Sequence, residues 1–202
     1  MSNMVGIVAL GAANRRSIEA ALRHAGAATR FVERPHEVGS CDALVLPGVA
    51  NFGYVAAELD RTELRPALIE AIRFGIPLLG ICVGFQLLFE GSDEAPRARG
   101  LGIFAGTVRR LRTPRVPHMG WNLVEPREPT FLRGWAYFAN AFAPDAFVRD
   151  AVASTNDGDD TFASVALRGN VLGVQFHPER SGAYGAALIA SFVQSAAVTY
   201  AR

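Results

Sequence analysis

The sequence has few cysteines, almost no net charge and no long apolar run, and each shortage excludes a class of protein. Two cysteines among 202 residues are too few for the disulfide framework of a small secreted scaffold. A net charge of +1 offers no electrostatic basis for binding nucleic acid or an anionic membrane surface. No apolar stretch reaches the roughly 18 residues of a membrane-spanning helix. We therefore expect a cytoplasmic protein with neither a nucleic-acid nor a membrane partner.

Cofactor and targeting motifs are also missing. There is no Walker sequence, and Gly100-Leu-Gly102 lacks the third glycine of a dinucleotide fingerprint. The first ten residues carry no basic region before their short apolar run, so they predict a first strand and not a signal peptide. We expect no cofactor and no metal.

The apolar content, half of all residues, is sufficient for a sizeable core, and we expect one domain over residues 1–202. In the first half, strand patterns alternate with helix patterns, which predicts a parallel sheet covered by helices on both faces. The expected strands are Met4–Leu10, Thr29–Val32, Asp42–Leu46 and Ile76–Ile81, and the expected helices are Ser17–Ala25 and Glu63–Phe74.

The second half has a different texture, with strands joined by turns and one clear helix. The expected strands are Leu101–Leu111, Trp121–Val124, Trp135–Ala139, Thr161–Leu167 and Val171–Phe176, and the helix is Tyr184–Ala196. The predicted fold class is thus an α/β protein with an open, mostly parallel sheet and antiparallel or mixed additions in its second half. The basic residues between Arg109 and Arg115 are expected to lie on a solvated strand and loop.

Cys82 lies where an apolar strand pattern ends and a helix pattern begins, with Gly80 and Gly84 two residues away on either side. Small flanking residues allow a sharp strand-to-helix turn, the nucleophile elbow. Such a turn exposes the side chain near backbone N–H groups that favour a thiolate. The alternative is a small cysteine buried in the core.

A thiolate nucleophile needs a base, and His177 is the best of the four histidines. Pro178 favours an extended conformation at His177, and in an extended segment Glu179 would lie on the same side as the imidazole. The carboxylate could then orient the ring. His118 has no acid nearby in sequence and is expected to be a structural or interface residue, while His24 and His36 are expected at the surface.

An acyl-transfer site also needs donors for an oxyanion. Pro47-Gly-Val-Ala50 follows a predicted buried strand, at the edge where open α/β sheets bind ligands. The backbone N–H of Val49, in the Gly48–Val49 turn, could therefore lie beside that of Val83. An ordinary Pro-Gly turn is the alternative.

These motifs resemble the class I, triad-type glutamine amidotransferases, and more narrowly the glutaminase subunits of imidazole glycerol phosphate synthase. The resemblance covers essentially the whole chain. Its segments are Pro47–Val49, Gly80–Ser92, Gly100–Gly102, Val116–Asn122 and Gly173–Gly182, and the His-Met-Gly-Trp-Asn block within Val116–Asn122 is specific to these subunits.

The resemblance implies a role for each matching residue. Cys82 would be the nucleophile, His177 the base and Glu179 its orienter, with Val83, Val49 and Gly48 supplying backbone oxyanion contacts. Gln86, Ala141 and Phe142 would hold L-glutamine, and the ammonia released would pass to a partner (β/α)8-barrel cyclase in a heterodimer. The residues implied at the partner interface are Asn14, Trp121, Asn122 and Arg180.

The sequence departs from the family pattern at several positions. Ala50 replaces a glycine in the oxyanion loop, Asn140-Ala-Phe142 replaces a His-Ser-Tyr run, and Arg180 replaces lysine. Two other functions stay open: a free-standing cysteine hydrolase of the γ-glutamyl hydrolase type, and a non-catalytic scaffold on the same fold. The intact Cys82, His177 and Glu179 argue against the scaffold.

Overall fold

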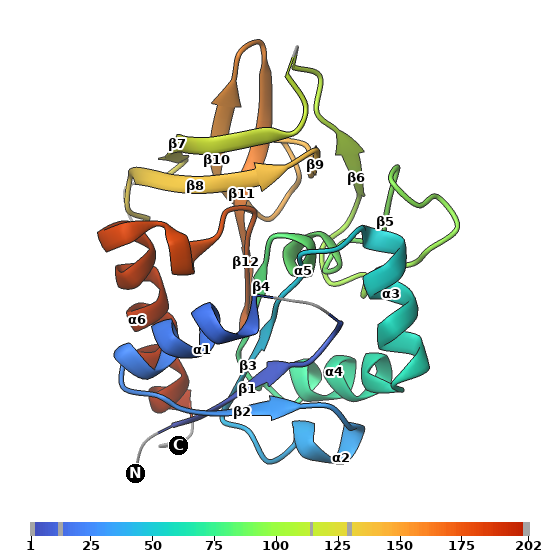
Figure 1. The fold of residues 1–202 in the computed structure, drawn as a ribbon, viewed down its shortest axis with the longest axis vertical. Helices are drawn as coiled ribbons and strands as arrows, with labels where there is room; N and C mark the ends of the chain where they lie inside the picture. Colours follow the sequence, from blue (N-terminus) through green and yellow to red (C-terminus); the bar gives the residue numbers. More distant parts are fainter. Residues whose placement is uncertain (1–2, 12–13, 114, 129–130, 200–202) are drawn as a thin grey trace.

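Nine strands form one mixed sheet in the order β2-β1-β3-β4-β12-β11-β10-β7-β8 (Figure 1). The structure is a computed structural model, and it describes residues 3–11, 14–113, 115–128 and 131–199. The parallel strands are β1 (Met4–Val8), β2 (Ala28–Val32), β3 (Ala43–Leu46), β4 (Leu78–Ile81) and β12 (Val171–Val174). The antiparallel strands are β11 (Asp160–Arg168), β10 (Ala151–Asp157), β7 (His118–Pro126) and β8 (Gly134–Asn140). The predicted fold class is confirmed.

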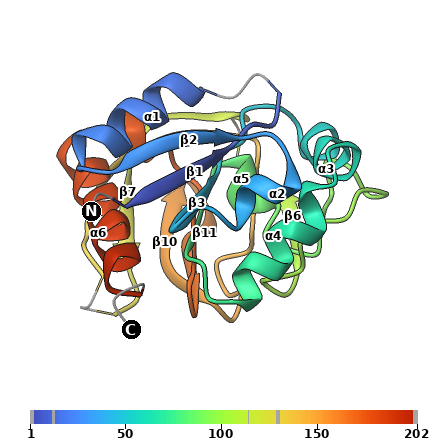
Figure 2. The ribbon, with the colours of Figure 1, turned by 90° about the horizontal axis from the view of Figure 1, so that it is seen from below.

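Helices cover both faces of the parallel half, as the apolar strands require. In Figure 2, α1 (Arg15–His24) and α6 (Gly182–Thr199) lie on one side of these strands. On the other side lie α2 (Pro35–Val38), α3 (Phe52–Arg61) and α4 (Leu64–Arg73). Strands β1, β3 and β4 are buried over most of their length, which explains their continuous apolar sequences.

Several elements differ from the sequence-based expectation. The strand expected over Leu101–Leu111 is reduced to β6 (Thr107–Arg110), which joins β5 (Gly91–Ser92) and β9 (Phe142–Ala143) in a small three-stranded sheet. Helix α3 and strand β10 were not expected. A signal for α3 was present, because Asn51 is an N-cap whose Oδ1 accepts a 2.8 Å hydrogen bond from the Tyr54 N–H.

The basic stretch is not simply solvated. The Arg109 guanidinium forms ion pairs with the Asp160 carboxylate at 2.7 Å and with the Asp145 carboxylate at 3.2 Å, and it is largely buried. The expectation for this residue was wrong, because its acidic partners lie far along the chain on other segments. Within the described residues, no helix has the length and apolar character needed to cross a bilayer.

Candidate functional site

Cys82 occupies a sharp turn between β4 and the short helix α5 (Val83–Gln86). Its backbone has φ 54° and ψ −112°, a conformation that non-glycine residues rarely adopt and that costs about 1–3 kcal/mol. The surroundings hold it there: the Cys82 N–H donates to the Val174 carbonyl of β12 at 2.9 Å. Because α5 has only four residues, the expected contribution of a helix dipole to the thiolate is small.

The glycines beside Cys82 are required by backbone contacts. A Cβ placed on Gly84 would lie 1.8 Å from the Leu46 carbonyl oxygen at the end of β3. A Cβ on Gly80 would lie 3.0 Å from the Gly84 carbonyl oxygen. The elbow is therefore pressed against β3, and neither neighbour can move without shifting the sheet.

Gly84→Ala is expected to lower the free energy of unfolding by at least about 3 kcal/mol, because the new methyl group collides with main-chain atoms that cannot rotate away. The measurement is chemical denaturation. Gly39→Ala is the matched control, since Gly39 has φ −68° and a Cβ added there would meet no other atom within 4 Å, so it should change stability little. Equal stabilities for the two variants would contradict the crowded elbow.

His177 lies beside Cys82 because of the pairing of two strands. Val174 of β12 pairs with Ile81 of β4 in parallel, so both chains leave the sheet at the same carboxyl edge. The His177 Nδ1 lies 3.0 Å from the Glu179 Oε1. His177 is extended, as Pro178 favours, but Pro178–Arg180 form a 3-10 turn. The expected contact is present, and it arises from this turn instead of from an extended segment.

The imidazole of His177 favours its protonated form, which is unusual for a buried ring. Burial lowers the pKa of His177, but hydrogen bonds to the Cys82 sulfur and to the Glu179 carboxylate outweigh burial and raise the pKa from 6.5 to about 10. The Glu179 side chain is completely buried, and among the described residues its Oε2 has no hydrogen-bond partner. A proton on His177 at neutral pH stabilises negative charge on the sulfur.

The His177 ring is expected to titrate near pH 10, holding its proton below that pH and releasing it as the pH rises through it. Cys82→Ala removes one of the two contacts that raise the pKa, so the midpoint should fall. Imidazole NMR shifts measure both midpoints, with the exposed His24 signal as an internal reference. Identical His177 midpoints in the two proteins would contradict the coupling to sulfur.

A pocket of about 360 Å³ opens over Cys82 and His177. Its lining contains most of the residues that the sequence singled out. These are Asn14, Val49, Cys82, Val83, Gln86, Ala141, Phe142, His177 and Arg180, together with Ala50, Asn51, Glu94, Ala139 and Asn140. Gly48 lies directly behind the lining, because a Cβ on it would be 2.7 Å from the Val83 Cβ and 2.8 Å from the Gly84 nitrogen. The Pro47–Ala50 loop thus contacts the elbow.

Sequence reasoning missed Glu94 and Gln175. Glu94 lines the pocket, and its Oε2 accepts from the Phe52 N–H at 2.8 Å. Gln175 is fully buried between Val174 and Phe176, with its Nε2 3.9 Å from the Cys82 sulfur. A polar residue inside the apolar run before His177 was an available signal for Gln175. Nothing local marks Glu94.

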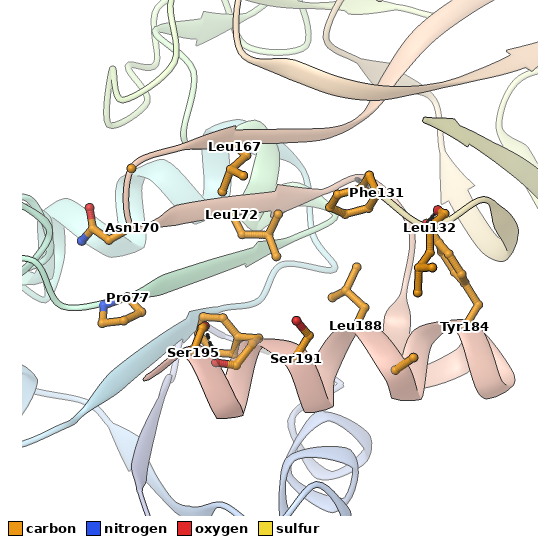
Figure 3. Close-up of a pocket in the computed structure, with 13 residues that line it drawn as sticks. Pro77, Phe131, Leu132, Leu167, Asn170, Leu172, Tyr184, Leu188, Ser191 and Ser195 are labelled. Atoms are coloured by element: carbon orange, nitrogen blue, oxygen red, sulfur yellow. Dashed lines mark hydrogen bonds between the residues drawn. The ribbon is translucent and has the colours of Figure 1, made fainter. Parts of the chain in front are cut away.

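A second, larger pocket lies at the opposite end of the same strands. Its volume is about 510 Å³, and its wall includes Pro77, which precedes β4, and Asn170, which precedes β12. Figure 3 shows α6 facing Leu172 across this mostly apolar space. It contains none of the candidate catalytic residues. Within the described part of the chain, no cluster of three or more His, Cys, Asp or Glu side chains could hold a metal ion.

Comparison with known proteins identifies the family. The profile described as "Glutamine amidotransferase class-I" matches residues 7–196. The protein "Imidazole glycerol phosphate synthase subunit HisH" of Deinococcus radiodurans is 41% identical over 191 residues, covering 90% of this chain and 89% of the relative. The chain belongs to the HisH family of class I glutamine amidotransferases. The hypothesis of a free-standing hydrolase is therefore not supported.

Two further relatives bear on the fold and on assembly. A solved structure described as a glutamine amidotransferase superposes with a TM-score of 0.77 at 21% identity, covering 96% of this chain and 98% of that one. "Imidazole glycerol phosphate synthase hisHF" of Schizosaccharomyces pombe is 35% identical over 207 residues, which are 94% of this chain but 38% of that longer protein. The superposition on the solved structure shows that this chain and that glutamine amidotransferase share one fold.

The His-Met-Gly-Trp-Asn block lies at the start of β7. Trp121 is 54% exposed, whereas the Asn122 Nδ2 donates to the Asn156 carbonyl at 2.8 Å and lies 3.3 Å from the His118 Nε2. The His118 Nδ1 lies 3.1 Å from the Asp157 Oδ2, an acidic partner that sequence proximity did not reveal. His118 is thus structurally engaged, as expected, while His24 and His36 are exposed.

Asn14 and Arg180 line the pocket, whereas Trp121 and Asn122 do not. The Arg180 guanidinium lies 3.9 Å from the centre of the Tyr137 ring on β8, a close cation–π contact. A flat guanidinium suits this stacking better than the lysine of the family pattern.

Proposed function

We propose that this chain hydrolyses L-glutamine through a Cys82 thioester and supplies the ammonia to a cyclase subunit of imidazole glycerol phosphate synthase. The observation that carries the proposal is a cysteine on a strained elbow that shares a pocket with a histidine, whose imidazole is itself held by a buried glutamate. Membership of the HisH family supports the same substrate. The proposed site of action is the cytoplasm, where a thiol stays reduced.

Thioester formation begins when His177 takes the thiol proton of Cys82. The thiolate attacks the side-chain amide carbon of glutamine, and the carbonyl electrons move to oxygen. When this tetrahedral adduct collapses, the C–N bond breaks and His177 donates its proton to nitrogen, so that ammonia leaves. Neutral His177 then takes a proton from water as the hydroxyl attacks the thioester. The C–S bond breaks, giving glutamate and regenerating the thiolate.

The oxyanion in both steps is proposed to be held by backbone N–H groups. Val83 follows the nucleophile directly, in the position where elbow enzymes place one donor. Val49 lines the same pocket, and Gly48 packs against Val83, so the second donor would come from the Pro47–Ala50 loop.

The amino-acid end of glutamine is proposed to lie over Gln86, Ala141 and Phe142. Both Nε2 protons of Gln86 are engaged, with the Phe142 carbonyl at 2.7 Å and the Gln175 Oε1 at 3.2 Å. What Gln86 can offer a ligand is therefore its Oε1, an acceptor. Together with the nearby Glu94 carboxylate, it suits the cationic α-amino group of the substrate.

The proposed partner is a (β/α)8-barrel cyclase, forming a heterodimer. The longer hisHF relative supports the association, because its name combines HisH with a second subunit and this chain matches only 38% of its length. Asn14, Trp121, Asn122 and Arg180 are the proposed interface residues. In the cyclase, the ammonia would be used to make imidazole glycerol phosphate, a precursor of histidine, together with an aminoimidazole carboxamide ribotide.

Glutamine hydrolysis is expected to be slow in the isolated chain and to rise by about 5- to 150-fold when the cyclase and its nucleotide ligand are present. The physical reason is that a partner which binds the competent pocket preferentially shifts the population towards it. Ammonia release with and without the cyclase measures the ratio. A chain that runs at full rate alone would refute this gating, and absence of any hydrolysis in the complex would refute the function.

A further inference from the structure

Gln175 forms a buried link between the nucleophile and the proposed substrate contacts. One position beyond the last parallel pair, Ile81 with Val174, the two chains present Cys82 and Gln175 side by side. The Gln175 Nε2 lies 3.9 Å from the Cys82 sulfur, and its Oε1 accepts from the Gln86 Nε2 at 3.2 Å. Gln86 in turn donates to the Phe142 carbonyl at 2.7 Å.

The chemistry of these partners determines the direction of every hydrogen bond. The Phe142 carbonyl can only accept, so the atom of Gln86 that faces it must be the NH₂ nitrogen. The second proton of that nitrogen then points to Gln175, so the Gln175 atom that accepts this hydrogen bond must be its amide oxygen. The Gln175 atom facing the sulfur is consequently an N–H donor.

A hydrogen-bond donor beside the Cys82 sulfur stabilises a thiolate at that position. Cys82 is 4% exposed, so water can solvate its thiolate only slightly, and burying a charge is costly unless it receives hydrogen bonds. His177 supplies one such bond. A neutral amide adds a second without adding a titrating group. The other charged groups around this pocket are Glu94 and Arg180, with Glu179 behind His177.

We propose that Gln175 is a positioning residue that donates a hydrogen bond to the Cys82 thiolate and ties its place to Gln86 and Phe142. The inference rests on the proposed glutaminase function. A ligand that contacts Gln86 or Phe142 can then change the hydrogen bond to the Cys82 sulfur, because the side-chain amides of Gln86 and Gln175 connect the two places. Gln175 acts through Cys82 and does not itself touch the reacting carbonyl.

The test measures the reactivity of Cys82 apart from glutamine turnover. In a Cys41→Ala background, so that one thiol remains, the rate of alkylation by iodoacetamide is followed against pH in Gln175→Met and Gln175→Glu. Both should move the midpoint of the rate profile upward by about one unit or more, because the thiolate loses a donor. Gln175→Glu should move it further by adding like charge. Gln194→Glu, on the exposed face of α6, is the matched control and should leave the profile in place.

Glutamine turnover in the complex with the cyclase supplies the second readout. Loss of positioning predicts that kcat falls about tenfold or more in Gln175→Met while KM changes less, since Gln86 can still meet the substrate. A folded Gln175→Met protein with the parent alkylation profile overturns the inference, even if Gln175→Glu fails to fold. If the Gln175 variants shift the alkylation midpoint but the parent protein hydrolyses no glutamine in the complex, the proposed function fails and the hydrogen bond from Gln175 to Cys82 stands.

Discussion

Cys82→Ala is expected to reduce glutamine hydrolysis by at least about 10⁴-fold while the protein stays folded. Without sulfur no thioester forms, and no other described residue places a nucleophile beside His177 in the pocket. Folding should survive because alanine keeps the Cβ, and the strained turn is held by the main-chain bond from residue 82 to Val174. Release of glutamate and ammonia measures the chemistry, and circular dichroism measures the fold.

The control for this change is Cys41→Ala. Cys41 is also buried, but it lies between α2 and β3, where its thiol contacts the Glu37 carbonyl at 3.5 Å. Burial raises the pKa of the Cys41 thiol, which keeps it in the inert protonated form. Cys41→Ala should keep its activity at a modest cost in stability. Near-normal hydrolysis in Cys82→Ala would end the assignment of the nucleophile.

His177→Ala is expected to lower kcat by about 10²- to 10⁴-fold, because one side chain serves as proton donor to ammonia, as base towards water and as the cation that stabilises the thiolate. It should also reduce stability, since the Glu179 carboxylate would stay buried without its partner. Turnover in the complex and thermal unfolding measure the two effects. The activity of Glu179→Gln should lie between that of His177→Ala and the parent, because the ring would remain but lose its orienter.

His118→Ala provides the contrast. The His118 Nδ1 lies 3.1 Å from the Asp157 Oδ2, and the ring packs against Phe138 and Phe162 at ring distances of 5.4 and 6.1 Å. We expect it to lose stability but to retain most of the chemistry per folded molecule. The assignment of the base would be reversed if His118→Ala were inactive and His177→Ala active.

Much of the fold and part of the candidate site could be predicted because their signals are local. The apolar run before Cys82 and the glycines around it encode the elbow, since only glycine fits where β3 presses on it. His177-Pro-Glu179 predicts its own internal contact, because two residues of separation suffice for the carboxylate to reach the ring. The catalytic roles of these residues stay predictions until they are measured.

Other features depended on which distant segments pair. Strand β12 lies beside β4 although about 90 residues separate them, and this register alone brings Gln175 and His177 to Cys82. The ion pair of Arg109 with Asp160 and the contact of His118 with Asp157 likewise join separate strands. Glu94 reaches the pocket from a segment whose own pattern says nothing of it.

The sequence by itself determined the alternating α/β architecture, the sharp turn that holds Cys82 and the residue types needed for acyl transfer. Tertiary structure alone decided the neighbours of the sulfur, the contacts that raise the pKa of His177, and the direction of the hydrogen bonds through Gln175 and Gln86. The physical reason is the separation along the chain over which each kind of interaction acts. Propensity, glycine sterics and side-chain periodicity act over a few residues, whereas burial and hydrogen bonding around a buried thiolate depend on strands brought together by the whole core.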